Sequence, residues 1–103
     1  MSFVVRRIIP VTHPSLAGHF PGNPVIPGVV QLAEVLDALA SWIPESRVAG
    51  FRTVKFLRPL PPDCSFTIEL EQTATATVRF NCHTGTQPLS KGTIILRSGQ
   101  DPV

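Results

Sequence analysis

The sequence predicts an α+β protein in which one long helix covers one face of an antiparallel sheet. An uninterrupted helical pattern occurs between Val29 and Ile43, a stretch with neither proline nor glycine. The segments after it alternate apolar and polar residues, which is typical of strands that have one covered face. Prolines and glycines separate these segments. One helix beside a run of short strands packs on one side of the sheet that the strands form.

Length and composition restrict the class of protein. A chain of 103 residues has the length of one domain, so we interpret residues 1–103 as a single unit. The net charge of +2, without a basic run, argues against nucleic-acid binding. No apolar run approaches the roughly 20 residues of a membrane span, and Met1 to Pro10 lacks a secretory signal, so we expect a cytoplasmic protein. The hydrophobic fraction of 43% is high for a small monomer and indicates a buried subunit interface.

The first half of the chain predicts a strand, a shaped loop and the helix. Phe3–Ile9 is rich in β-branched residues and is followed by Pro10, which is typical of a strand. Thr12–Gly28 is dense in proline and glycine, and each proline fixes its own φ and disfavours a helical conformation of the residue before it. This loop is therefore expected to be rigid. The helix begins after Pro27 and Gly28, and Pro44 ends it.

The predicted helix carries a broad apolar arc. Steps of ~100° per residue place the following residues on it, and we expect this arc to pack against the sheet: Val29, Leu32, Ala33, Leu36, Leu39, Ala40 and Ile43. The opposite side carries Gln31, Glu34, Ala38 and Ser41, and Asp37 lies at the border.

The second half predicts four strands. Their ranges are Val48–Leu57, Ser65–Glu71, Ala74–Cys82 and Lys91–Arg97, with a turn at Gly85–Pro88. Strict alternation in the middle two predicts these inward side chains: Phe66, Ile68, Leu70, Ala74, Ala76, Val78, Phe80 and Cys82. Cys64 and Cys82 fit neither a disulfide framework nor a zinc-binding spacing, so we expect reduced thiols and no metal site.

The loop before the helix resembles a family signature. Gly18-His-Phe-Pro-Gly-Asn-Pro-Val-Ile-Pro-Gly28 is similar to the H-F-P-G-x-P-[VI]-x-P-G-V motif of hotdog-fold β-hydroxyacyl-[acyl carrier protein] dehydratases. The likeness extends in element order from about Val5 to Arg97. The short chain looks most like the compact dehydratases of polyene-type lipid clusters.

The resemblance implies a fold, an activity and partners. It implies a sheet wrapped around one long central helix, and a homodimer with two active sites at its interface. It implies dehydration of a 3-hydroxyacyl thioester to the trans-2-enoyl thioester, in fatty-acid or polyene lipid synthesis. The substrate would arrive on the phosphopantetheine arm of acyl carrier protein, or on coenzyme A. No cofactor of the protein's own and no metal are implied.

Dehydration needs a base at the α-carbon, an acid at the hydroxyl and a partner for the thioester oxygen. His19 matches the family's catalytic histidine, and a neutral imidazole near pH 7 suits the base. Gly28 matches the family glycine whose N–H stabilises the enolate-like oxygen. At a helix start this N–H lacks an intrahelical partner and lies in positive potential. The plainer interpretation is that Gly28 only permits the turn.

The acid is less clear, because the position at which the family carries Glu or Asp is Ala33 here. Three outcomes stay open. A one-residue shift of helix register aims Glu34 into the tunnel, Asp37 serves from one turn away, or neither reaches and the chain is a weak or inactive homologue. Glu34 is our candidate acid.

Further residues are candidates for binding. Phe20, Val25 and Pro27, together with Ala33 and Asp37, are expected to line an acyl tunnel. The resemblance suggests that Arg52, Lys55 and Arg58 contact the acidic carrier protein or the arm's phosphate, although ordinary solvated charges are the alternative.

Two other functions stay open. Ala33 stands where the family carries an acidic residue. This allows a non-catalytic subunit that binds an acyl chain or forms a heterodimer with a related active subunit. A hotdog thioesterase, which would hydrolyse the thioester, is the other alternative. Assembly beyond a dimer is also left open.

Overall fold

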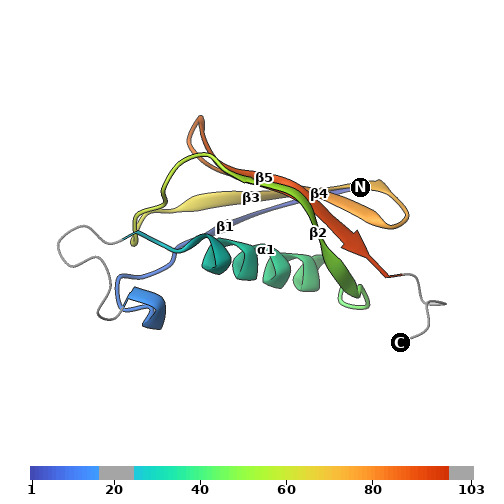
Figure 1. Cartoon of the computed structure of the whole chain (residues 1–103), viewed down its shortest axis with the longest axis horizontal. Coiled ribbons are helices and arrows are strands. Elements are labelled where there is room, and N and C mark those ends of the chain that lie inside the picture. The colour runs from blue at the N-terminus through green and yellow to red at the C-terminus, as the bar shows by residue number, and fades with distance from the viewer. Residues whose placement is uncertain (17–24, 98–103) are drawn as a thin grey trace.

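The structure, a computed structural model, describes residues 1–16 and 25–97 (Figure 1). Within them the chain forms these elements: β1 (Ser2–Arg7), a 3-10 turn η1 (Pro14–Leu16), α1 (Gly28–Trp42), β2 (Val48–Phe56), β3 (Phe66–Ala74), β4 (Thr77–Thr84) and β5 (Gln87–Leu96). The predicted strand, helix and four-strand order is confirmed.

The strands form one antiparallel sheet in the order β1-β3-β4-β5-β2. Consecutive hairpins place β3, β4 and β5 side by side in its centre, and β1 and β2 are its two edges. Figure 1 shows α1 lying along one face of the curved sheet. The predicted α+β class is therefore confirmed. No helix among the described residues is long and apolar enough to cross a membrane.

The core lies between α1 and the inward faces of β3 and β4. The predicted inward side chains are confirmed for Phe66, Ile68, Leu70, Val78, Phe80 and Cys82. The prediction is wrong for Ala74 and Ala76, which are exposed. Thr75 and Ala76 form the tight turn between β3 and β4, so Ala76 belongs to no strand, and Ala74 lies at the end of β3 beside this turn.

The predicted face of the helix is wrong in part, although Leu32 and Ile43 of the predicted arc pack against the core. The helix residues that are buried are Gln31, Val35, Ala38 and Leu39, of which the predicted arc contained only Leu39. Val29, Ala33 and Ala40 are exposed instead. Apolar residues occupy more than half of the circumference of α1, so periodicity alone does not choose which of its apolar sides meets the sheet.

The edge strand β2 is irregular. Its pairing with β5 shifts register between Val48 and Gly50, and again between Arg52 and Lys55. Thr53, inside the second shift, has a φ of 58°, which is unusual for a β-branched residue. Such bulges bend a strand and redirect its side chains. Here the bulges precede Phe56, the last residue of β2.

Candidate active site

A cavity of about 520 Å³ lies where α1 begins and β2 ends. It is lined by the segment entering the helix, the first turn of the helix and the segment leaving β2: Val25, Ile26, Gly28, Val29, Gln31, Phe56, Leu57, Arg58 and Pro59. Most of these side chains are apolar. A concave, largely apolar site with few polar groups is the usual form of a small-molecule pocket.

Backbone contacts hold the two walls of this cavity together. The N–H of Ile26 donates to the carbonyl oxygen of Leu60 at 2.8 Å, and both side chains are buried. The next residue, Pro27, precedes the helix, and its carbonyl oxygen accepts a hydrogen bond from Val30 N–H at 2.9 Å. The entry to α1 is thereby fixed against the segment that follows β2.

The start of the helix contributes an electropositive wall. The first N–H groups of an α-helix have no intrahelical partner, and they carry the positive end of the helix dipole. The first turn of α1 contains no acidic residue that would neutralise this potential. Gly28 is the first helical residue and lines the cavity. This placement agrees with the predicted oxyanion role of Gly28, which stays a prediction.

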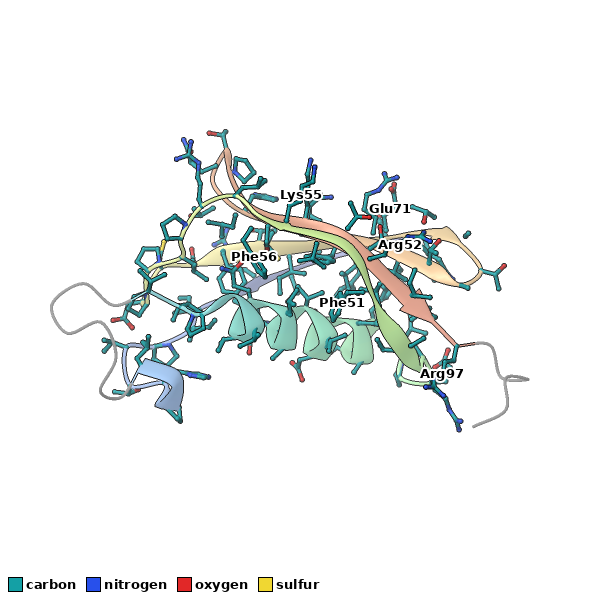
Figure 2. The ribbon with its side chains drawn as sticks, in the orientation of Figure 1. Phe51, Arg52, Lys55, Phe56, Glu71 and Arg97 are labelled. Atoms are coloured by element: carbon teal, nitrogen blue, oxygen red, sulfur yellow. The ribbon has the colours of Figure 1, made fainter. Side chains whose placement is uncertain are left out.

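Phe56 packs directly over Gly28. A Cβ atom built on Gly28 would lie 2.7 Å from Cζ of the Phe56 ring, closer than real contacts allow. The absence of a side chain therefore lets the ring approach the helix backbone. Figure 2 shows Phe56 on the helix side of the sheet and Lys55 on the opposite side.

Gln31 is a site residue that the sequence reasoning missed. Predicted on the solvent side, it is only 2% exposed and lines the cavity. Ser90 on β5, 1% exposed, donates from Oγ to Gln31 Oε1 at 3.0 Å. The signal in the sequence is faint, because a polar residue in a helix is ordinarily read as exposed.

Cys82, buried on β4, pairs with Ser90 in the sheet. Burial raises the pKa of its thiol to about 11, and the hydrogen bond with Ser90 opposes this rise. The thiol is therefore protonated at neutral pH, which excludes Cys82 as a nucleophile there.

The two helix carboxylates lie away from the cavity. Arg7 on β1 places a guanidinium nitrogen 2.6 Å from Asp37 Oδ2 and 3.6 Å from Glu34 Oε1. β1 and β2 are opposite edges of the sheet, so these carboxylates face the β1 side while the cavity lies at the β2 side. Asp37 is not among the lining residues of this cavity, and its role in a substrate tunnel stays a prediction. Glu34 as the acid stays a prediction that requires this ion pair to break.

The other residues predicted to line the tunnel differ in where they lie relative to the cavity. Val25 lines the cavity, and Pro27 lies between two residues that do. Ala33 is exposed and is not among the lining residues of this cavity, and its role in a substrate tunnel stays a prediction. His19 and Phe20 lie outside the described residues.

The predicted carrier-binding cations are separated between two faces. Arg58 lines the cavity. Lys55 lines a second hollow of about 220 Å³ with Arg79 and Lys91, on the face of the sheet away from α1. Arg52 follows the inward Phe51 and is exposed. The contact of these cations with a carrier protein or with the phosphate of its arm stays a prediction. Within residues 1–16 and 25–97, no group of three His, Cys, Asp or Glu side chains is arranged to hold a metal ion.

Comparison with known proteins adds a family and a fold. The model of a family described as ApeI-like, ApeI dehydratase, matches residues 2–93. The 3-hydroxyacyl-[acyl-carrier-protein] dehydratase FabZ of Thermomicrobium roseum is 37% identical over 86 residues, which cover 76% of this chain and 56% of that protein. FabZ of Chlamydia trachomatis is 32% identical over 80 residues, covering 68% and 52%.

Among solved structures, a chain of the dehydratase heterocomplex ApeI:P from Xenorhabdus doucetiae superposes with a TM-score of 0.83. The match covers 94% of this chain and 88% of that chain at 23% identity, and it confirms the predicted hotdog fold. The chain spans about half the length of the curated relatives it matches.

Proposed function

Since this chain belongs to the ApeI-like dehydratase family, we propose that it removes water from a 3-hydroxyacyl thioester to give the trans-2-enoyl thioester. The observation that supports this most directly is the apolar cavity that contains the start of α1. Such a cavity suits an acyl chain, and the helix start suits a thioester oxygen that becomes negative during the reaction. The FabZ relatives are named as dehydratases of this substrate class.

The mechanism assigns the proton transfers to His19. Its neutral imidazole takes the proton from C2, and the thioester oxygen, hydrogen-bonded to Gly28 N–H, accommodates the resulting charge. The electron pair then forms the C2–C3 double bond as the C3 hydroxyl leaves. The His19 imidazolium returns its proton to that hydroxyl, which departs as water. This route needs no carboxylate, and Glu34 is the alternative acid.

The direct test is an assay of the purified chain with 3-hydroxyoctanoyl-N-acetylcysteamine. Formation of the enoyl thioester and release of free thiol are measured in parallel. Enoyl product without thiol supports the dehydratase. Thiol release identifies a thioesterase, and neither product by the chain alone identifies a non-catalytic subunit, so either result contradicts the proposal.

We expect Gly28→Ala to raise the KM for this substrate about tenfold, the lower range for a misplaced methylene-sized group in a pocket. The new Cβ displaces the Phe56 ring, which is 51% exposed and has room to move along the cavity wall. Steady-state kinetics measure the change. The matched control is Gly50→Ala, because nothing lies within 4 Å of a Cβ at Gly50. An unchanged KM in Gly28→Ala contradicts the assignment of this wall to substrate binding.

For the carrier, we propose acyl carrier protein, the carrier in the names of the FabZ relatives. Arg58 lines the cavity, which supports a role for its guanidinium in binding the phosphate of a phosphopantetheine arm. Arg52 and Lys55 lie on other surfaces and would meet the acidic protein itself. A lower KM for the carrier-bound substrate than for its N-acetylcysteamine analogue supports this. We propose that the reaction needs no cofactor beyond the carrier of the substrate. We also propose that the protein is cytoplasmic.

We also propose a homodimer, with assembly beyond it left open. Three of the large apolar side chains that remain exposed lie together at the cavity: Val29, Phe56 and Leu57, with exposures of 73%, 51% and 45%. β2, which ends at Phe56, is an edge strand, and among the described strands only β5 pairs with it. An exposed edge and an apolar patch beside it are both features that a second subunit covers.

A second candidate is a catalytic heterodimer in which a related subunit supplies the acid. It is favoured by the exposed Ala33 and by the engagement of Glu34 and Asp37 with Arg7. The ApeI:P neighbour is itself a heterocomplex. Activity that appears only when a related subunit is added distinguishes this candidate from the homodimer.

We expect Ala33→Glu to raise kcat about tenfold or more, because a positioned general acid contributes roughly 10²–10⁴-fold. The substitution restores a carboxylate at the position where the family carries one. The matched control is Ala40→Glu, an exposed alanine two turns further along α1. Equal or lower kcat in Ala33→Glu, with the control unchanged, contradicts the view that the missing carboxylate at this position limits the reaction.

A further inference from the structure

The wall of the cavity contains two polar side chains among its described lining residues. Arg58 is exposed, whereas Gln31 is buried. Burial of an amide has a free-energy cost unless its hydrogen bonds are made, so a buried amide in an apolar wall is an unfavourable choice for packing alone. Polar groups placed singly in apolar pockets usually fix the orientation of a ligand.

Ser90 fixes the orientation of this amide. Its hydroxyl donates to Gln31 Oε1 across 3.0 Å, from β5 to α1, and both residues are almost fully buried. Ser90 is paired with Cys82 in the sheet, so the support is part of the rigid core. Anchoring one atom of a planar amide restricts the directions in which its remaining hydrogen-bonding positions point.

Gln31 also lies at a suitable distance from the start of the helix. It is three residues after Gly28, a rise of about 4.5 Å along α1. Both residues line the same cavity. The Gly28 N–H and the Gln31 side chain can therefore serve one substrate whose two oxygens are separated by three carbon atoms, the arrangement of a thioester carbonyl and a 3-hydroxyl.

We propose that Gln31, held by Ser90, hydrogen-bonds the 3-hydroxyl of the substrate and selects 3-hydroxyacyl over unsubstituted acyl chains. This assignment rests on the proposed function. Glu34 and Asp37 are not among the lining residues of the cavity, so they do not compete for this hydroxyl there. A site that hydrogen-bonds a substrate hydroxyl discriminates against the analogue that lacks this hydroxyl. When that analogue binds, the polar group of the protein is left without a partner.

The test compares two amide analogues of the pantetheine thioester, one with a 3-hydroxyoctanoyl chain and one with an octanoyl chain. Calorimetric titration of the wild-type chain is expected to show the hydroxylated analogue binding about tenfold more tightly, the gain from one net hydrogen bond. In Gln31→Leu this ratio falls to about one. Ser90→Ala keeps the Gln31 amide but removes the hydrogen bond that orients it. The ratio of the two affinities is then expected to lie between the wild-type value and one.

The control is Val35→Ala, buried on the same helix and absent from the cavity lining, which lowers stability but keeps the wild-type ratio. A wild-type ratio in Gln31→Leu overturns the inference. If Gln31→Leu does not fold, a wild-type ratio in Ser90→Ala overturns it. Wild-type protein that binds neither analogue and forms no enoyl product refutes the proposed function instead, so the two failures are distinguishable.

Discussion

Replacing His19 with alanine is expected to lower kcat by about 10²–10⁴-fold, the usual contribution of a general acid–base residue. In the proposed reaction His19 moves both protons, so its loss removes both transfers. The residual rate reflects the cavity and the helix start alone. The measurement is enoyl thioester formation at saturating substrate, with circular dichroism and thermal unfolding to confirm an intact fold.

The matched control is His83→Ala. His83 lies on β4, where its ring contacts the Glu69 carboxylate and, at 3.1 Å, the carbonyl oxygen of Gly85. None of these residues lines the candidate cavity. We expect near wild-type kcat in the control. Equal turnover in His19→Ala and wild type would exclude His19 as the base and, with it, the mechanism built on the motif.

Local signals allowed the element order to be predicted. The dense prolines before Gly28 marked the start of α1, and the alternation around Phe66–Leu70 marked β3 and its inward face. The turn at Thr75 and Ala76 was missed because it contains none of the residues that usually announce one, such as glycine, proline, asparagine or aspartate.

The missed parts of the site depend on contacts between distant residues. Gln31 is buried because Ser90, 59 residues further along the chain, satisfies its oxygen. Asp37 is directed to the β1 edge by Arg7, 30 residues before it. Periodicity along α1 describes which residues share a side but not which side meets the sheet. These features follow from tertiary packing, which overrides a local pattern.

The largest expected effect on stability is that of Phe80→Ala, which should lower the free energy of unfolding by about 3–5 kcal/mol. Phe80 on β4 is fully buried and packs edge-to-face against Phe51 of β2, with ring centroids 5.9 Å apart. Its ring also fills the space beside Gly92 of β5, where a Cβ would lie 2.7 Å from Cε2. One side chain therefore joins three strands, and alanine leaves a cavity among them.

Urea denaturation measures this loss, and Arg79→Ala is the matched control. Arg79 is the exposed neighbour of Phe80, and its ion pair with Glu71 lies at the surface, so we expect a change within about 0.5 kcal/mol. Because β2 carries Phe56 into the cavity wall, loss of the Phe51–Phe80 contact should also raise the substrate KM. A destabilisation below about 1 kcal/mol would mean that the strands collapse into the vacated space. That result would contradict the view that Phe80 holds β2 in place, together with the part of the cavity wall that β2 forms.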